Sequence, residues 1–126
     1  MNLEELNVYR ISMELGEEIW SLVEKWDYFR KDTIGKQLVR AIDSVAANIS
    51  EGFGRFHYND AKKFYYYSRG SLFETKTWIT KSYNRKIIDK KRYVEIQTAI
   101  VDLSVKLNNF IKSVGKDGNW NRNTGF

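Results

Sequence analysis

The chain has 126 residues, no cysteine, no proline and a formal net charge of +5. This length indicates one domain, large enough to bury a hydrophobic core without disulfides or a structural metal. The absence of cysteine excludes disulfide frameworks, thiolate zinc sites and cysteine nucleophiles. The first residues do not resemble a secretory signal, and no apolar run reaches the ~18 residues of a membrane span. We therefore expect a soluble, cytoplasmic protein without membrane contact.

Apolar residues recur at steps of three and four along most of the chain, which is typical of amphipathic helices. Proline costs about 3 kcal/mol inside a helix, so its absence leaves long helices uninterrupted. The pattern predicts four helices, over residues 3–26, 33–55, 59–85 and 89–114. The expected N-terminal caps are Asp32 or Thr33 for the second helix, Asn59 for the third and Asp89 for the fourth.

Short connections between helices of similar length predict an all-α fold, an antiparallel up-down-up-down four-helix bundle over residues 1–114. Gly52 and Gly54 are expected to provide the left-handed exit at the end of the second helix. Residues 115–126 are rich in glycine and asparagine and lack periodicity. They are predicted to form a disordered C-terminal tail.

Two stretches in the middle of the chain resemble one protein family. The first is Ser44-Val-Ala-Ala-Asn48-Ile-Ser-Glu51-Gly, and the second is Gly70-Ser-Leu-Phe-Glu74. They are similar to the S-x-x-x-N-I-x-E-G and G-S-x-x-E stretches of the 23S rRNA-intervening-sequence proteins. The resemblance covers roughly residues 3–114 and extends to the accessory variability proteins of bacterial diversity-generating retroelements.

The resemblance implies a four-helix bundle that assembles as a ring-like homopentamer. The retroelement relatives bind nucleic acid and a reverse transcriptase, so RNA, DNA or a nucleic-acid-processing protein are the partners that it implies. Ser68 and Arg69 depart from the family pattern, since many relatives have smaller apolar residues before the glycine. The name of the intervening-sequence branch records where its genes occur and implies no activity.

A row of polar residues, here called the polar seam, follows the apolar stripes of the second and third predicted helices. We favour a structural network that satisfies polar groups between the helices, because no nucleophile stands beside an activating base. A glycine inside a helix costs about 1 kcal/mol relative to alanine, so Gly70 suggests a close helix–helix approach. The members of the polar seam are Ser44, Asn48, Glu51, Arg55, Gly70, Ser71 and Glu74.

We expect no catalytic group, cofactor or metal. His57 is the only histidine and falls in a predicted turn. Glu51 and Glu74 lack the Glu-x-x-His pair of di-iron bundles. No strand precedes Gly52-Phe-Gly54 and no lysine–serine pair follows it, so this stretch is not a phosphate loop. An enzyme built around Glu51, Arg55 and Glu74 ranks third among the functions considered.

Surplus apolar residues indicate self-association. The first predicted helix has a second apolar stripe, and the third carries aromatic residues opposite its core face. The fourth predicted helix also has surplus apolar residues, but a wider core within one chain could bury part of them. Large exposed apolar surfaces are rare on monomers, so we expect a homo-oligomer, and the resemblance favours five subunits. The expected contact residues are Tyr9, Met13, Trp20, Tyr66 and Phe73.

Charge is segregated along the chain. Residues 1–24 contain six acids and one base, whereas residues 76–92 contain seven bases and one acid. The leading hypothesis is a non-enzymatic homo-oligomer that binds nucleic acid as an accessory protein through this basic region. The alternative is a protein–protein adaptor or scaffold whose basic end is incidental. The expected phosphate contacts are Lys81, Arg85, Lys86, Lys90, Lys91 and Arg92.

Overall fold

The computed structural model describes residues 1–115, which contain four long helices and no strand. The predicted tail, apart from Gly115, lies outside the described residues. A short 3-10 helix, Leu3–Glu5, precedes α1, and a short helix α2 continues through a π-helical segment, Lys31–Gly35, into α3. The helices are α1 (Asn7–Val23), α2 (Tyr28–Arg30), α3 (Lys36–Phe53), α4 (Tyr58–Asn84) and α5 (Lys90–Ser113).

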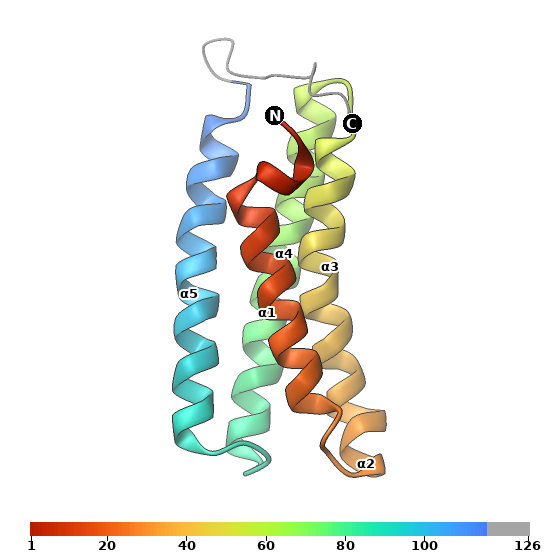
Figure 1. Cartoon of the computed structure of the whole chain (residues 1–126), viewed down its shortest axis with the longest axis vertical. Coiled ribbons are helices and arrows are strands. Elements are labelled where there is room, and N and C mark those ends of the chain that lie inside the picture. Colours follow the sequence, from red (N-terminus) through yellow and green to blue (C-terminus); the bar gives the residue numbers. More distant parts are fainter. Residues whose placement is uncertain (116–126) are drawn as a thin grey trace.

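Successive long helices run in opposite directions and pack side by side (Figure 1). The order around the bundle is α1, α3, α4 and α5, because contacts join α1 to α3, α3 to α4, α4 to α5 and α5 back to α1. The α1–α2 connection and the α4–α5 turn therefore lie at one end. The predicted all-α, antiparallel up-down-up-down bundle is confirmed. None of the helices in residues 1–115 is long and apolar enough to cross a membrane.

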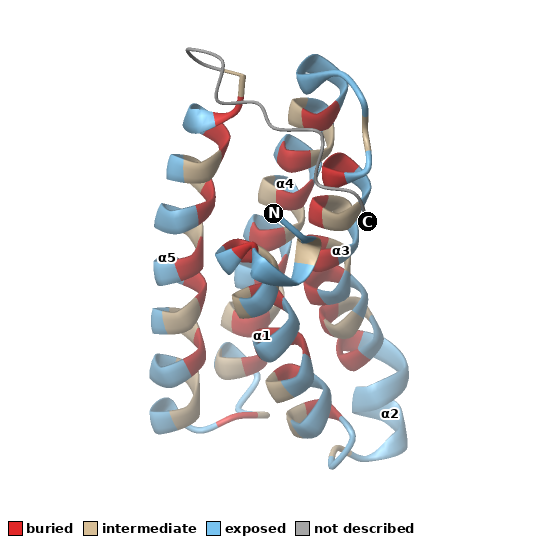
Figure 2. Ribbon diagram, turned by 45° about the horizontal axis from the view of Figure 1, so that its top comes forward, coloured by how far each residue is buried: buried red, intermediate tan, exposed pale blue. Residues whose placement is uncertain are grey.

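One face of each long helix is buried and the opposite face is exposed (Figure 2). The buried positions fall three or four residues apart, as the apolar periodicity predicts. The largest fully buried side chains are Ile19 on α1, Leu38, Ile42, Val45 and Ile49 on α3, Tyr65, Leu72 and Ile79 on α4, and Ile96, Ile100, Leu103 and Leu107 on α5.

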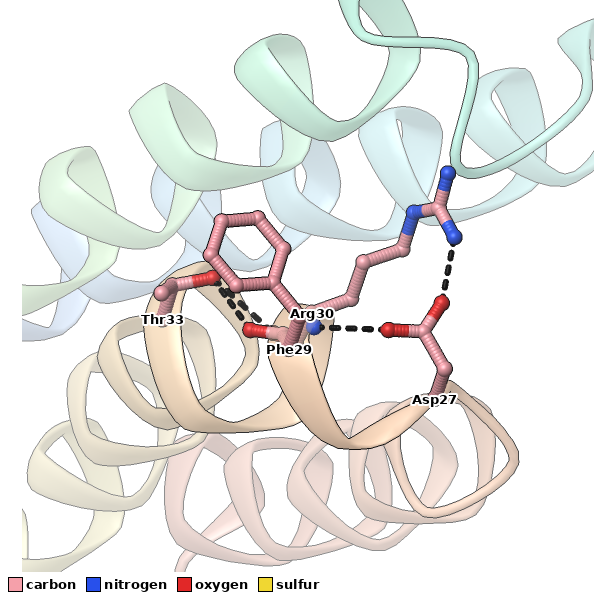
Figure 3. A network of polar contacts seen from close by, with 4 residues as sticks. All are labelled: Asp27, Phe29, Arg30 and Thr33. Carbon is pink, nitrogen blue, oxygen red and sulfur yellow. Dashed lines mark hydrogen bonds and ion pairs between the residues drawn. The ribbon is translucent and has the colours of Figure 1, made fainter.

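The second helix of the bundle begins earlier than predicted, at Tyr28. The Asp27 carboxylate accepts a hydrogen bond from the Arg30 amide at 3.0 Å and also pairs with the Arg30 guanidinium (Figure 3). The Thr33 hydroxyl donates to the Phe29 carbonyl at 2.7 Å, within the same turn. The prediction that Asp32 or Thr33 caps this helix is therefore wrong, because Asp27 is the cap.

Of the other two predicted caps, one is confirmed and one is wrong. Asp89 caps α5, since its carboxylate accepts a 2.8 Å hydrogen bond from the Arg92 amide, as expected. Asn59 does not cap α4; it lies inside the helix, and His57 occupies the cap position without a side-chain hydrogen bond to the helix.

The glycines have other roles than those predicted. Gly52 and Gly54 are not left-handed; Gly54 ends α3 with φ at −79°. A Cβ on Gly52 would lie 2.6 Å from Cε1 of Tyr65 and 2.9 Å from the Ala61 carbonyl, so this glycine lets α3 approach α4. A Cβ on Gly70 would meet nothing within 4 Å. The close approach predicted at Gly70 is therefore wrong, and it occurs at Gly52.

Candidate nucleic-acid interface

The α4–α5 turn is fixed by backbone hydrogen bonds to the last turn of α4. The amide of Arg85 donates to the Lys81 carbonyl and that of Ile87 donates to the Ser82 carbonyl, both at 2.9 Å. Lys86, between them, has a left-handed backbone with φ at 61°. This pattern is the usual hydrogen-bonded end of a helix with a left-handed residue. Asp89 then caps α5, so the turn holds its cationic residues in a defined arrangement.

Five of the six predicted phosphate contacts are accessible at this turn. Within residues 1–115 none of the five forms an ion pair. The negative end of the α4 dipole favours nearby cations, which explains Lys81, Arg85 and Lys86 without a ligand. Lys90 and Lys91 stand instead at the positive, N-terminal end of α5, where the helix dipole does not favour a cation. The five are Lys81, which is partly buried, and the exposed Arg85, Lys86, Lys90 and Lys91.

Arg92, the sixth predicted contact, is already engaged. Its Nη1 lies 2.8 Å from Oε1 of Glu18 on α1 and 3.3 Å from Oε1 of Glu95. The guanidinium thus joins α5 to α1 and is not a free phosphate ligand. A phosphate would have to compete with Glu18 for this guanidinium, and the role of Arg92 as a phosphate contact stays a prediction.

The α1–α2 connection lies at the same end of the bundle as the α4–α5 turn (Figure 1), and its sequence adds further charge and two aromatic residues there. Tyr28 and Phe29 are 79% and 73% exposed. Lys25 and Lys31 beside them are exposed and, in the described part of the chain, form no ion pair. Sequence analysis did not include this segment among the expected binding residues. The signal for it was the run of aromatic and basic residues that follows Trp26.

The polar seam does not join α3 to α4 by hydrogen bonds of its own members. The Ser44 hydroxyl and the Asn48 amide donate to carbonyls one turn earlier in α3, and Arg55 pairs with Glu51 at 2.9 Å. Glu74 accepts from the indole of Trp78 in α4. The predicted hydrogen-bond network between the helices is therefore wrong at Ser44, Asn48 and Glu74, because each of these side chains reaches a partner in its own helix. Arg55, which follows the end of α3, does contact α4, since its guanidinium carbon lies 4.5 Å from the centroid of the Phe64 ring.

Gly70 and Ser71 complete the polar seam on α4, where Gly70 is exposed and Ser71 is partly buried. The hydrogen bond between α3 and α4 comes instead from Ser68, whose buried hydroxyl donates to the Val45 carbonyl at 2.8 Å. Sequence analysis named Ser68 only as a departure from the family pattern. Residues 1–115 hold no group of three or more histidine, aspartate or glutamate side chains able to bind a metal ion.

The predicted oligomer contacts lie on two opposite sides of the bundle. Tyr9, Met13 and Trp20 line grooves between α1 and α3, whereas Phe73 lines a groove between α4 and α5 together with exposed valines. Met13, Trp20, Tyr66 and Phe73 are between 44% and 53% exposed. Tyr9 is only partly exposed and packs against the core.

Two grooves of opposite charge follow one another along the α1–α3 surface. The acidic groove, about 380 Å³, has Tyr9, Met13, Glu17 and Asp43 among its lining residues. Desolvation in this groove, and secondly the charge of Glu17, raise the pKa of Asp43 above its usual value. The basic groove, about 580 Å³, is lined by Trp20, Val23, Glu24, Lys31, Gly35, Lys36, Val39 and Arg40.

Comparison with known proteins identifies the family. No curated protein matches the chain. A crystal structure of a protein of unknown function from the S23 ribosomal protein family of Bacteroides thetaiotaomicron superposes with a TM-score of 0.75. It is 22% identical, and the match covers 83% of this chain and 98% of that one, which shows a shared fold. The family model for 23S rRNA-intervening sequence proteins matches residues 4–109, so the chain belongs to that family.

Proposed function

We propose that this chain is a non-enzymatic, homo-oligomeric accessory protein that binds RNA or DNA through phosphate contacts at the α4–α5 turn. The observation that carries the proposal is the set of cations on this turn that lack an ion pair within residues 1–115. Phosphate binding of this kind needs positive charge at an accessible surface and no particular base-reading motif. The proposal agrees with the expectation from the sequence analysis that the chain resembles retroelement accessory proteins, whose members bind nucleic acid.

The same proposal includes assembly into a ring. The apolar α1–α3 and α4–α5 sides lie on opposite sides of the bundle, so contact between them joins copies head to tail. Head-to-tail contacts close into rings when the rotation between subunits allows it. The family resemblance favours five subunits, and each copy would present its own basic turn. Light scattering should then give a mass near five times 14.9 kDa.

A salt titration tests the nucleic-acid proposal. Fluorescence anisotropy of labelled RNA and DNA should report binding at low salt that weakens steeply as salt is added. Each neutralised phosphate should contribute about −0.9 to the slope of log K against log salt on duplex DNA, and about −0.7 on a single strand. An absence of binding at low salt would contradict the proposal.

A protein–protein adaptor is the second candidate. The exposed Trp20 and Phe73, each set in a groove, favour it, because such aromatic groups commonly anchor protein interfaces. An adaptor would show little affinity for nucleic acid at any salt concentration. The salt titration therefore distinguishes the two functions.

A further inference from the structure

The α4–α5 side of the bundle carries two cations, Arg69 and Lys76. Arg69 lies over the ring of Phe73, with its guanidinium carbon 5.3 Å from the ring centroid, and its Nε is buried without a hydrogen-bond partner in the described part of the chain. Lys76 lines the groove of this side together with Phe73. Neither cation forms an ion pair within residues 1–115. Because arginine binds carboxylates through paired hydrogen bonds, the guanidinium can take an acid from another molecule.

The opposite side of the bundle carries two acids, Glu17 and Asp43. Both line the acidic groove between α1 and α3, and neither has an ion-pair partner among the described residues. Oδ1 of Asp43 lies close to α1, since a Cβ on Gly16 would come within 3.3 Å of it. Desolvation, and secondly the charge of Glu17, raise the pKa of Asp43. A cation placed in this groove would therefore stabilise the two carboxylates.

The arginine and the acids lie at the same height along the bundle. The hydrogen bond from Ser68 to the Val45 carbonyl aligns α4 with α3. Arg69 is one residue further along α4, and Asp43 is two residues back along α3. Because the two helices are antiparallel, both steps lead toward the same end of the bundle (Figure 1). At a rise of 1.5 Å per residue, the two Cα heights differ by only about 1.5 Å.

Equal height matters in a ring whose axis runs along the bundles. Rotation about such an axis moves each subunit sideways and leaves the height of every residue unchanged. The α4–α5 side of one copy then faces the α1–α3 side of the next, as the proposed head-to-tail contact requires. Arg69 therefore meets Glu17 and Asp43 of the neighbouring copy without any shift along the axis.

Apolar surface surrounds the charges on both sides. Phe73, Val101 and Val105 are between 45% and 55% exposed and line a groove of about 170 Å³ between α4 and α5. Met13, in the acidic groove, is 44% exposed. An ion pair enclosed by such surfaces is screened by salt less than a pair in water. Contact of either side with its own kind would bring like charges together, so the charges select the head-to-tail contact.

We infer that Arg69 of one copy binds Glu17 and Asp43 of the next, and that this pairing determines which sides of the subunits meet. The inference rests on the proposed function, namely on its head-to-tail assembly, and names the residues that direct it. Arg69 is also one of the two residues noted in the sequence as departures from the family pattern. Ionisation of Asp43 opposes folding only in a separate subunit, where no cation faces it.

The test reverses the charges and follows assembly by light scattering over a dilution series. Arg69→Glu and Asp43→Arg should each raise the midpoint concentration of assembly at least about tenfold, because one partner of an enclosed pair is lost and like charges meet. At moderate concentration the mass should fall toward 14.9 kDa. The double variant, which carries the pair in reversed order, should recover most of the assembly.

Lys106→Glu is the matched control. It makes the same change of charge as Arg69→Glu, but Lys106 lines a groove between α1 and α5, outside both contact sides. Its assembly midpoint should stay within about twofold of the parent value. Circular dichroism shows whether each variant keeps its helices. If Arg69→Glu does not fold, Arg69→Gln and Asp43→Asn replace the reversals in a double-mutant cycle, and their effects on the midpoint should be less than additive.

Three outcomes would overturn the inference. If the parent assembles and the folded single variants assemble equally well, the charges do not direct the contact and the proposed assembly stands alone. If each single variant dissociates but the double variant does not recover, or if the cycle shows additive effects, Arg69 and Asp43 do not pair. If the parent has a mass of 14.9 kDa at every concentration, the inference and the assembly in the proposed function are both wrong.

Discussion

The α3–α4 and α5–α1 pairs are neighbouring contacts of one bundle, yet they are held together differently. Between α3 and α4, Gly52 lets the backbone come close to Tyr65, and a buried hydroxyl of Ser68 bonds to a main-chain carbonyl. Between α5 and α1, the polar link is the partly exposed ion pair of Arg92 and Glu18. Stability should therefore depend strongly on the close α3–α4 contact and only weakly on the polar groups between α5 and α1.

The largest expected effect is that of Gly52→Ala. Its new methyl group would meet Tyr65 and the Ala61 carbonyl, and the backbone atom cannot move aside easily. Overpacking of this kind costs about 1–3 kcal/mol, so the urea midpoint should fall. Gly70→Ala is the control. Its new methyl group would point into open space, so the change should raise the free energy of unfolding by up to about 1 kcal/mol. Equal effects of the two changes would contradict the proposed close approach.

Ser68→Ala should have the next largest effect. The change removes the donor to the Val45 carbonyl inside the core and should lower the free energy of unfolding by about 1–2 kcal/mol. Ser44→Ala removes a comparable hydroxyl that bonds within its own helix at a partly exposed position. We expect a change within about 0.5 kcal/mol for Ser44→Ala, measured in the same urea titration. A reversed order would show that the α3–α4 hydrogen bond is unimportant.

Arg92→Ala tests the contribution of the polar contact between α5 and α1. A partly exposed ion pair contributes only about 0.2–1 kcal/mol, so a double-mutant cycle with Glu18→Gln should give a small coupling energy. Nucleic-acid affinity should hardly change, because the guanidinium is already occupied. A large loss of affinity with intact stability would return Arg92 to the phosphate-binding set.

The smallest effect, and one of opposite sign, is expected for Asp43→Asn. Because the folded state raises the pKa of Asp43, ionisation disfavours folding, and stability falls as pH rises from the unfolded value of 3.8 through the folded pKa. The asparagine side chain cannot ionise, so this loss disappears and the variant should be slightly more stable than the parent at neutral pH. The advantage should vanish in acid, where Asp43 is protonated in both states. Thermal unfolding at the two pH values checks this, and a less stable variant at neutral pH would contradict it.

The bundle could be predicted from the sequence because the helical spacing of apolar residues is repeated in every long helix. Apolar residues such as Ile42, Val45 and Ile49 recur at helical spacing through α3, and the same holds for the other helices. The residue at which each helix begins was harder to predict. Both Asp27 and Asp32 could cap a helix, and only the structure shows that the Asp27 carboxylate accepts the hydrogen bond from the Arg30 amide. A glycine also has no side chain to indicate which face it needs, so the close approach was predicted at Gly70 although it occurs at Gly52.

The candidate site could be predicted only where it is local in sequence. The cations of the α4–α5 turn lie within one short stretch, so their proximity followed from a single turn. The engagement of Arg92 with Glu18 joins positions far apart in the chain and needed the fold. A helical wheel places Asn48 beside the stripe but cannot tell whether its amide reaches across to another helix or back to the Ser44 carbonyl.

The most direct test of nucleic-acid binding is the charge reversal of Lys86, Lys90 and Lys91 to glutamate. A matched control reverses three exposed lysines elsewhere on the bundle, Lys63, Lys106 and Lys112, so that both variants have the same net charge. In low-salt anisotropy with labelled RNA and DNA, the first variant should lose binding while the control keeps most of it, with helical content and mass unchanged in both. If the first variant binds as well as the parent, or both lose binding equally, the α4–α5 turn is not the interface.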